Sequence, residues 1–162
     1  MKIRCINLPN YPNFQLASLV ALGYCPTFGM ATNVLIEPGV YGIYASKGTR
    51  IYDGDFYGNA REIIESLPNF HPAGWESDTP RGCVLGVCRV TKCHTKPTIA
   101  SLRSNHFLRL IGGISLEVEA KYIDVPLPTI EAKTAFPGVV DVEVSASFSL
   151  MEALKELGEA NG

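Results

Sequence analysis

The fold is decided by the stretch from Gln15 to Lys47, which reads QLASLVALG over residues 15–23, YCPTFGM over 24–30 and GVYGIYASK over 39–47. In the first piece, the apolar residues at positions 16, 19 and 20 recur at helical spacing. Gly23 suits the left-handed conformation that ends a helix. The last piece follows a Pro-Gly turn and predicts a strand over Val40–Ser46. The middle piece is predicted to be the turn between them.

The rest of the chain alternates short strands with two further helices. We expect helices over Tyr57–Leu67 and from Ser149 onward, where Ser149 and Glu152 form a capping box. Pro126 and Pro128 are predicted to end the strand that precedes them. The expected strands cover residues 2–8, 81–93, 107–111, 114–125 and 138–144.

This order predicts an α+β fold built on a small closed or nearly closed β-barrel. We expect about six strands, two inserted helices and a C-terminal helix. Residues 1–145 would form the barrel domain, and residues 146–162 its helical extension. A chain of 162 residues fits one domain.

Bulk composition limits the possible functions. The formal net charge of −2 supplies no global field for phosphates, so contact with nucleic acid needs a local basic patch. No apolar run approaches the length of a membrane span, and the N-terminus lacks the apolar segment of a signal peptide. The chain has five cysteines, an odd number that favours reduced thiols. We therefore expect a cytoplasmic protein without membrane contact.

Four motifs in sequence order resemble the ASCH family, whose members have a PUA-like β-barrel. QLASLVALG resembles the first helix of that family, and YGIYASK resembles its strand ending in His-Ala-Ser-Lys, with Tyr44 in place of histidine. PRGCVLGV, residues 80–87, resembles its Pro-x-Gly-x-Ile-x-Gly strand. VPLPTI, residues 125–130, followed by Gly138, loosely resembles its closing segment. The resemblance covers roughly residues 1 to 145.

The resemblance implies an RNA-associated role, and some members of the family act as ribonucleases or as amidohydrolases on acetylated cytidine. Their signature, Gly-x-Lys-x-x-Glu-x-Arg, follows the first helix. At the same spacing from Gly23 this chain has Cys25, Phe28 and Met30. The amine, the carboxylate and the cation that this chemistry uses are all absent at these positions, so no catalytic residue is carried over.

Six residues are our candidates for ligand binding, in a cleft between the turn after the first helix and the barrel. They are Cys25, Thr27, Ser46, Lys47, Trp75 and Arg81. Trp75 would stack a base, and Phe28 and Met30 would make the cleft more apolar. Each candidate has an ordinary structural alternative: a half-buried turn cysteine, a solvated lysine or arginine, or a tryptophan that covers the core.

Two other arrangements of reactive residues are considered. Cys25 could be a nucleophile with His71 or His94 as its base, although it follows a helix C-terminus, which raises rather than lowers a thiol pKa. Cys83, Cys88 and Cys93 with His94 suggest zinc, but their spacing is wrong for a metal site. Strict alternation would also turn Cys88 away from the other two cysteines. We expect no metal and no cofactor.

Three functions remain open. The leading hypothesis is a binding module for RNA or a modified nucleotide. The second is a hydrolase of RNA or a nucleoside in which Cys25, Thr27 and Lys47 take altered catalytic roles, and the third is a protein-interaction barrel that has lost its ligand pocket. An open cleft beside Lys47 favours the first two, whereas a pocket filled by Phe28 and Met30 favours the third.

Overall fold

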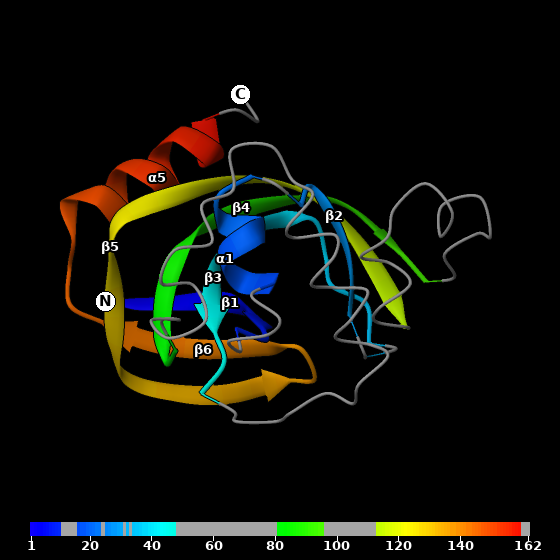
Figure 1. Cartoon of the computed structure of the whole chain (residues 1–162), viewed down its shortest axis with the longest axis horizontal. Helices are drawn as coiled ribbons and strands as arrows, with labels where there is room; N and C mark the ends of the chain where they lie inside the picture. The colour runs from blue at the N-terminus through cyan, green and yellow to red at the C-terminus, as the bar shows by residue number, and fades with distance from the viewer. Residues whose placement is uncertain are drawn as a thin grey trace, which may run out of the picture.

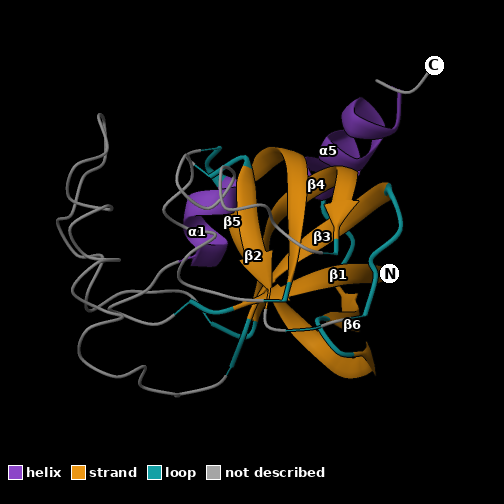
Figure 2. Ribbon diagram, turned by 90° about the vertical axis from the view of Figure 1, so that its right-hand side faces the viewer, coloured by secondary structure: helices purple, strands orange, loops and turns teal. Residues whose placement is uncertain are grey.

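The protein is an α+β structure in which one β-sheet carries a helix on each face (Figures 1 and 2). The computed structural model describes residues 1–10, 16–23, 25–30, 32, 34–47, 81–95 and 113–159. The strands are β1 (Lys2–Leu8), β2 (Thr27–Met30), β3 (Gly39–Ala45), β4 (Cys83–His94), β5 (Ile114–Phe136) and β6 (Val139–Val144). The helices are α1 (Leu16–Ala21) and α5 (Phe148–Glu159). The predicted helix over residues 57–67 and strand over 107–111 lie outside the described residues.

The six strands form one sheet in the order β2-β5-β4-β3-β1-β6. β1 and β3 are parallel, and every other pair is antiparallel. Because β6 also pairs with β5, the sheet closes on itself, and Figure 1 shows β5 bending around this ring. The predicted α+β class is therefore confirmed, together with a β-rich core of about six strands.

β5 is longer than the sequence predicted, since it runs through Pro126 and Pro128 without a break. Two features explain how the strand accommodates both prolines. The β4–β5 register shifts between Val84 and Gly86, so the segment that contains Pro126 lies in a bulge, where proline is tolerated. The Thr129 amide donates to the Gly82 carbonyl, so the nitrogen of the preceding Pro128 points away from β4.

β2 occupies part of the segment predicted to be a turn, so that prediction is wrong. Its four residues pair with β5 from Thr27↔Glu117 to Met30↔Ile114. Phe28 and Met30 are buried in the core beside α1. The segment has too few residues to show a strand pattern by itself, and its partner lies almost ninety positions further along the chain.

α1 matches its prediction closely. Five of its six residues are buried, and it packs on β3 and β4. Gly23 follows it with φ +84°, and its amide donates to the Val20 carbonyl at 3.1 Å. Glycine adopts this left-handed conformation without steric cost, which explains why the helix ends there.

α5 packs on β4 and β5, and Figure 2 shows the two helices on opposite sides of the strands. The helix begins at Phe148, and the predicted capping box is wrong. The Leu150 amide bonds to the hydroxyl of Ser147 at 3.3 Å, so Ser147 is the N-cap rather than Ser149. Leu150 and Ala153 then enter an apolar cluster with Tyr44, Val84 and Val142.

Candidate functional site

Three of the six predicted ligand-binding residues meet where β3 ends and β4 begins. Ala45 pairs with Cys83, and the Gly82 amide donates to the Ala45 carbonyl at 2.7 Å. This pairing brings Ser46 and Lys47 next to Arg81 and Gly82. We call these four residues the basic corner.

Gly82 fixes the course of the Lys47 side chain. A Cβ atom at Gly82 would lie 2.6 Å from Lys47 Cε and 2.8 Å from Lys47 Cγ, so the lysine stem lies directly over the glycine backbone. Gly82 also has φ +67°, a conformation that L side chains rarely adopt. Its carbonyl accepts bonds from the Thr129 amide and hydroxyl, each at 3.3 Å. The corner is therefore held by three strands.

The two cations of the basic corner are exposed and have no carboxylate partner in the described part of the chain. Several other described cations are neutralised, as in the pairs Arg4–Asp141, Arg89–Glu119, Lys121–Glu156 and Lys133–Glu131. Lys47 and Arg81 therefore supply two local positive charges on a chain whose net charge is −2. Such a pair is suited to an anionic group.

Tyr44 lies behind the corner and was not among the sequence candidates. Its side chain is only 5% exposed, and it hydrogen-bonds with Thr129. Burial raises the pKa of Tyr44, so its phenol stays protonated at neutral pH. Its register partner on β1 is Asn7, whose Oδ1 is buried with no hydrogen-bond partner in the described residues. The match of Tyr44 to a motif histidine was the signal that could have placed it here.

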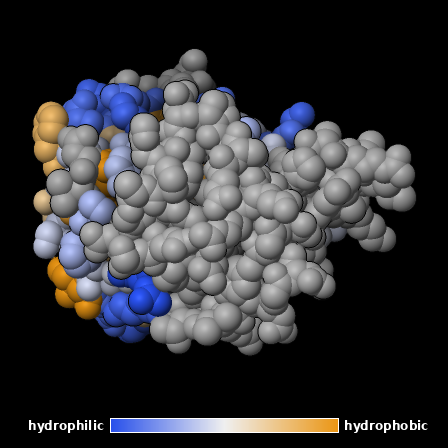
Figure 3. All heavy atoms as spheres, in the orientation of Figure 1, coloured by the Kyte–Doolittle hydropathy of each residue, from blue (hydrophilic) through white to orange (hydrophobic). Residues whose placement is uncertain are grey.

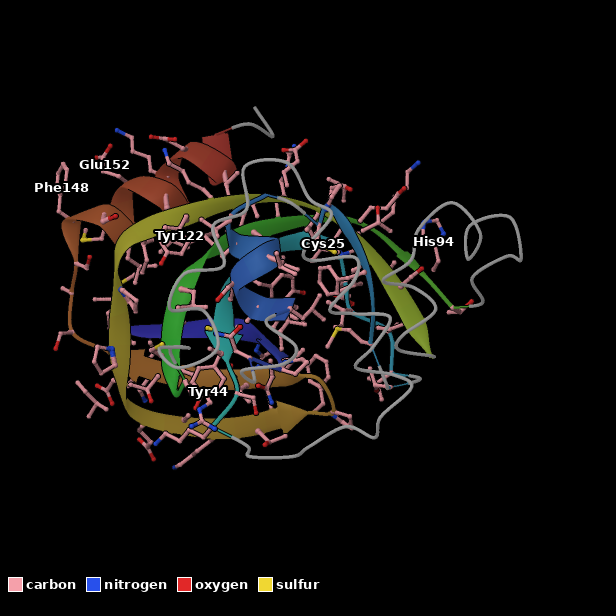
Figure 4. The ribbon with its side chains drawn as sticks, in the orientation of Figure 1. Cys25, Tyr44, His94, Tyr122, Phe148 and Glu152 are labelled. Atoms are coloured by element: carbon pink, nitrogen blue, oxygen red, sulfur yellow. The ribbon has the colours of Figure 1, made fainter. Side chains whose placement is uncertain are left out.

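The other two described candidates, Cys25 and Thr27, belong to a different part of the molecule. Thr27 pairs with Glu117, which pairs with Lys92 of β4, whereas the basic corner adjoins Cys83. Lys92 and Cys83 are nine residues apart on β4, which corresponds to roughly 30 Å along the strand. Figure 4 likewise shows Cys25 and Tyr44 far apart. The six candidates therefore do not form one cluster, and Trp75 lies outside the described residues.

Cys25 is a core residue. Its side chain is 2% exposed, and its Sγ donates to the Thr27 carbonyl at 3.2 Å. Burial raises the pKa of the thiol far above its usual range, so the thiolate needed for nucleophilic attack does not form at neutral pH. His71, one of its two candidate bases, lies outside the described residues. His94, the other, is exposed and lies 3.4 Å from Glu117.

The cysteines of β4 are arranged differently from the strict alternation expected. Cys83 and Cys88 both belong to the apolar cluster around α1, and Cys93 packs against it. Register shifts near Leu85 and Thr91 reset the alternation, which places the three on one side. Burial raises the pKa of Cys83 to about 11 and that of Cys88 to about 12. Within the described ranges, no group of three potential ligands is close enough to hold a metal ion.

A separate open hollow of about 430 Å³ lies over β1, β6 and the end of β5. Its lining includes Lys2, Arg4 and Lys133 and, of opposite sign, Glu131, Asp141 and Glu143. Two of the cations are paired with carboxylates within the hollow. This hollow therefore offers no excess of either charge, unlike the basic corner.

The sequence matches no protein-family model and no curated protein. The resemblance to the ASCH family is thus an expectation that rests on the four sequence motifs. In the described residues, no helix has the length and apolar character that crossing a bilayer requires.

Proposed function

We propose that this protein is a small binding module for RNA or a modified nucleotide, with a PUA-like barrel of the ASCH type, and that it holds a phosphate at the basic corner. The observation that carries this proposal is that Lys47 and Arg81 both lie beside Gly82, exposed and without carboxylate partners among the described residues. Lysine and arginine contacts to phosphate supply most of the affinity of such proteins.

Three further observations support the proposal. The sheet closes through the β5–β6 pairing, as a barrel requires. Lys47 also ends the strand that resembles the His-Ala-Ser-Lys strand of the family. All five cysteines are free thiols, which fits a cytoplasmic module in a reducing compartment.

The proposal assigns no catalytic residue. Cys25, Phe28 and Met30 stand at the signature positions of the family, and all three are buried. This burial favours a scaffold whose catalytic pocket has been filled, and it makes a protein-interaction barrel the second candidate. The basic corner lies away from that filled region, so nucleotide binding there does not depend on the pocket.

The test is the affinity for a fluorescein-labelled single-stranded RNA, measured by anisotropy over a series of salt concentrations. Lys47→Ala and Arg81→Ala should each weaken binding and lower the slope of log K against log salt by about 0.7, the value for one contact to a single strand. Lys47→Arg should retain binding. Lys155→Ala removes an exposed charge from α5 and should leave both quantities unchanged.

Two outcomes would reject the proposal. One is the absence of RNA and nucleoside binding by the unaltered protein. The other is an equal loss of affinity in Lys155→Ala, which would mean that binding follows overall charge. If the protein instead hydrolyses acetylated cytidine and the activity survives Cys25→Ala and Lys47→Ala, the chemistry lies elsewhere on the chain.

A further inference from the structure

The last part of β5 has an open edge. β5 pairs with β4 as far as Pro128, and the Thr129 amide still reaches Gly82. Beyond that point β5 pairs only with β6 among the described strands, from Thr129 to Phe136. Figure 1 shows this part of β5 along the bottom of the ring, outside β6. The five residues 131–135 are all exposed, so both faces of the strand are accessible as well.

Backbone hydrogen bonds alternate in direction from one residue to the next along a strand, and this alternation shows which N–H and C=O groups point out of the open edge. Val144 exchanges two bonds with Met1, each 2.9 Å, so alternate residues of β6 face β1 and the others, Asp141 and Glu143, face β5. Their partners Lys133 and Glu131 therefore direct their backbone groups toward β6. The N–H and C=O groups of Ala132 and Thr134 consequently point away from β6, on the side where no described strand pairs with β5.

The charged side chains beside these backbone groups would place opposite charges next to each other if two copies of the strand paired. Glu131 and Lys133 flank Ala132, and their side chains pair with each other at 3.0 Å while both remain exposed. If two copies of the strand met antiparallel about a two-fold axis at Ala132, Glu131 of each copy would lie opposite Lys133 of the other. Axes at Glu131 or Lys133 would place like charges opposite each other, which is destabilising. Of these three axes, only the one at Ala132 also uses outward backbone groups in a central reciprocal pair.

We propose that the protein forms a symmetric homodimer by antiparallel pairing of residues 130–134 of β5, centred on Ala132. The two sheets then become continuous, and Ile130, which is 68% exposed, lies opposite Thr134 of the other copy. In Figure 3, hydrophobic and hydrophilic residues lie side by side at the lower left, near the bend of β5. An interface of one strand pair is smaller than a standard one, so we expect a dissociation constant in the micromolar range.

The test is sedimentation equilibrium of the full chain, without nucleic acid and under reducing conditions, from about 1 to several hundred micromolar. The unaltered protein should shift from monomer to dimer across this range. Ala132→Pro removes an outward N–H without touching the β5–β6 bonds, and should give a monomer with an unchanged melting temperature.

Charge variants test the register independently of any folding defect. Lys133→Glu places four carboxylates at the interface and should abolish the dimer, whereas Glu131→Lys combined with Lys133→Glu restores complementarity and should restore it. Lys155→Glu makes the same change in charge on α5 and should leave the dimer intact.

In oxidising buffer, Ala132→Cys should form an intermolecular disulfide, since paired Cα atoms lie about 5.5 Å apart. Thr134→Cys should not, since the two copies lie about 13 Å apart along the strand.

If the protein is still a monomer at the highest concentration, the proposal is overturned. The open edge of β5 would then be available to a strand of a different protein. A dimer that persists in both Ala132→Pro and Lys133→Glu would also overturn it, because the interface would then lie elsewhere. Since no RNA is present, neither result depends on the function of the basic corner.

Discussion

At the scale of single residues, Gly82 has the largest influence on the candidate site. Its positive φ makes it an unfavourable position for any other residue, and its missing side chain leaves the space through which Lys47 runs. From the sequence, this glycine is one of fifteen and belongs to a motif. Only the tertiary contact shows that it positions the lysine.

Gly82→Ala should lower the free energy of unfolding by about 1–2 kcal/mol, because alanine is strained in the left-handed region. The new methyl group should also displace Lys47 and weaken RNA binding. Urea denaturation measures the first effect and anisotropy the second. Gly158→Ala is the matched control: its Cβ meets nothing within 4 Å, and in α5 it should stabilise the protein by up to about 1 kcal/mol. Equal stability of the two variants would contradict this role for Gly82.

At the scale of elements, the ends of helices and strands depended on contacts that a local pattern does not specify. The capping-box pattern in the sequence favours Ser149 as the cap of α5. The structure uses Ser147 because the first turn must start early enough to direct Leu150 and Ala153 into the cluster beneath the helix. Packing of the apolar face therefore outweighs the local signal.

Ser147→Ala should destabilise the protein by about 1 kcal/mol, the usual loss when a helix N-cap is removed. Ser145→Ala alters an exposed serine just before the helix and should change stability by no more than a few tenths of that value. Thermal unfolding followed by circular dichroism at 222 nm compares the two. A larger effect at Ser145 would show that the cap has been misassigned.

At the scale of the whole molecule, the closed sheet joins segments from both ends of the chain. β1 pairs with β6 across more than 130 residues, and the N-terminal ammonium group donates to the Val144 carbonyl. Four cysteines are buried in the two apolar clusters: Cys5 lies in the cluster beneath α5, and Cys25, Cys83 and Cys88 lie in the cluster around α1. Burial raises the pKa of each of their thiols.

These thiols should make the fold sensitive to alkali. In the unfolded chain they lose their protons near pH 9, whereas in the folded protein they keep them, so the unfolded state binds fewer protons. The free energy of unfolding should therefore be constant below about pH 8 and fall as pH rises from about 9 toward 11, by up to about 1.4 kcal/mol per pH unit for each thiol. Buried Tyr44 adds to the decline above pH 10.

Urea denaturation at pH 7.5, 9 and 10 with a reductant measures this dependence. Cys88→Ala should be less stable than the unaltered protein at pH 7.5 because it leaves a small cavity, yet its stability should fall less steeply with pH. Equal unfolding free energies at pH 7.5 and pH 10 would show that the thiols are accessible to water.

The sequence by itself determined those features that depend on neighbouring residues. These are α1 with its glycine stop, the alternating strands β1, β3, β4 and β6 to within two residues, and the α+β class. Periodic burial and the backbone freedom of glycine are local properties, so they are visible in a linear pattern. The tertiary structure alone decided that β2 is a strand, that β5 passes through two prolines, and that Lys47 lies over Gly82, next to Arg81, while Cys25 is buried. Each of these results depends on pairing between residues distant in the chain, which fixes where a side chain lies and leaves no repeated signal in the sequence.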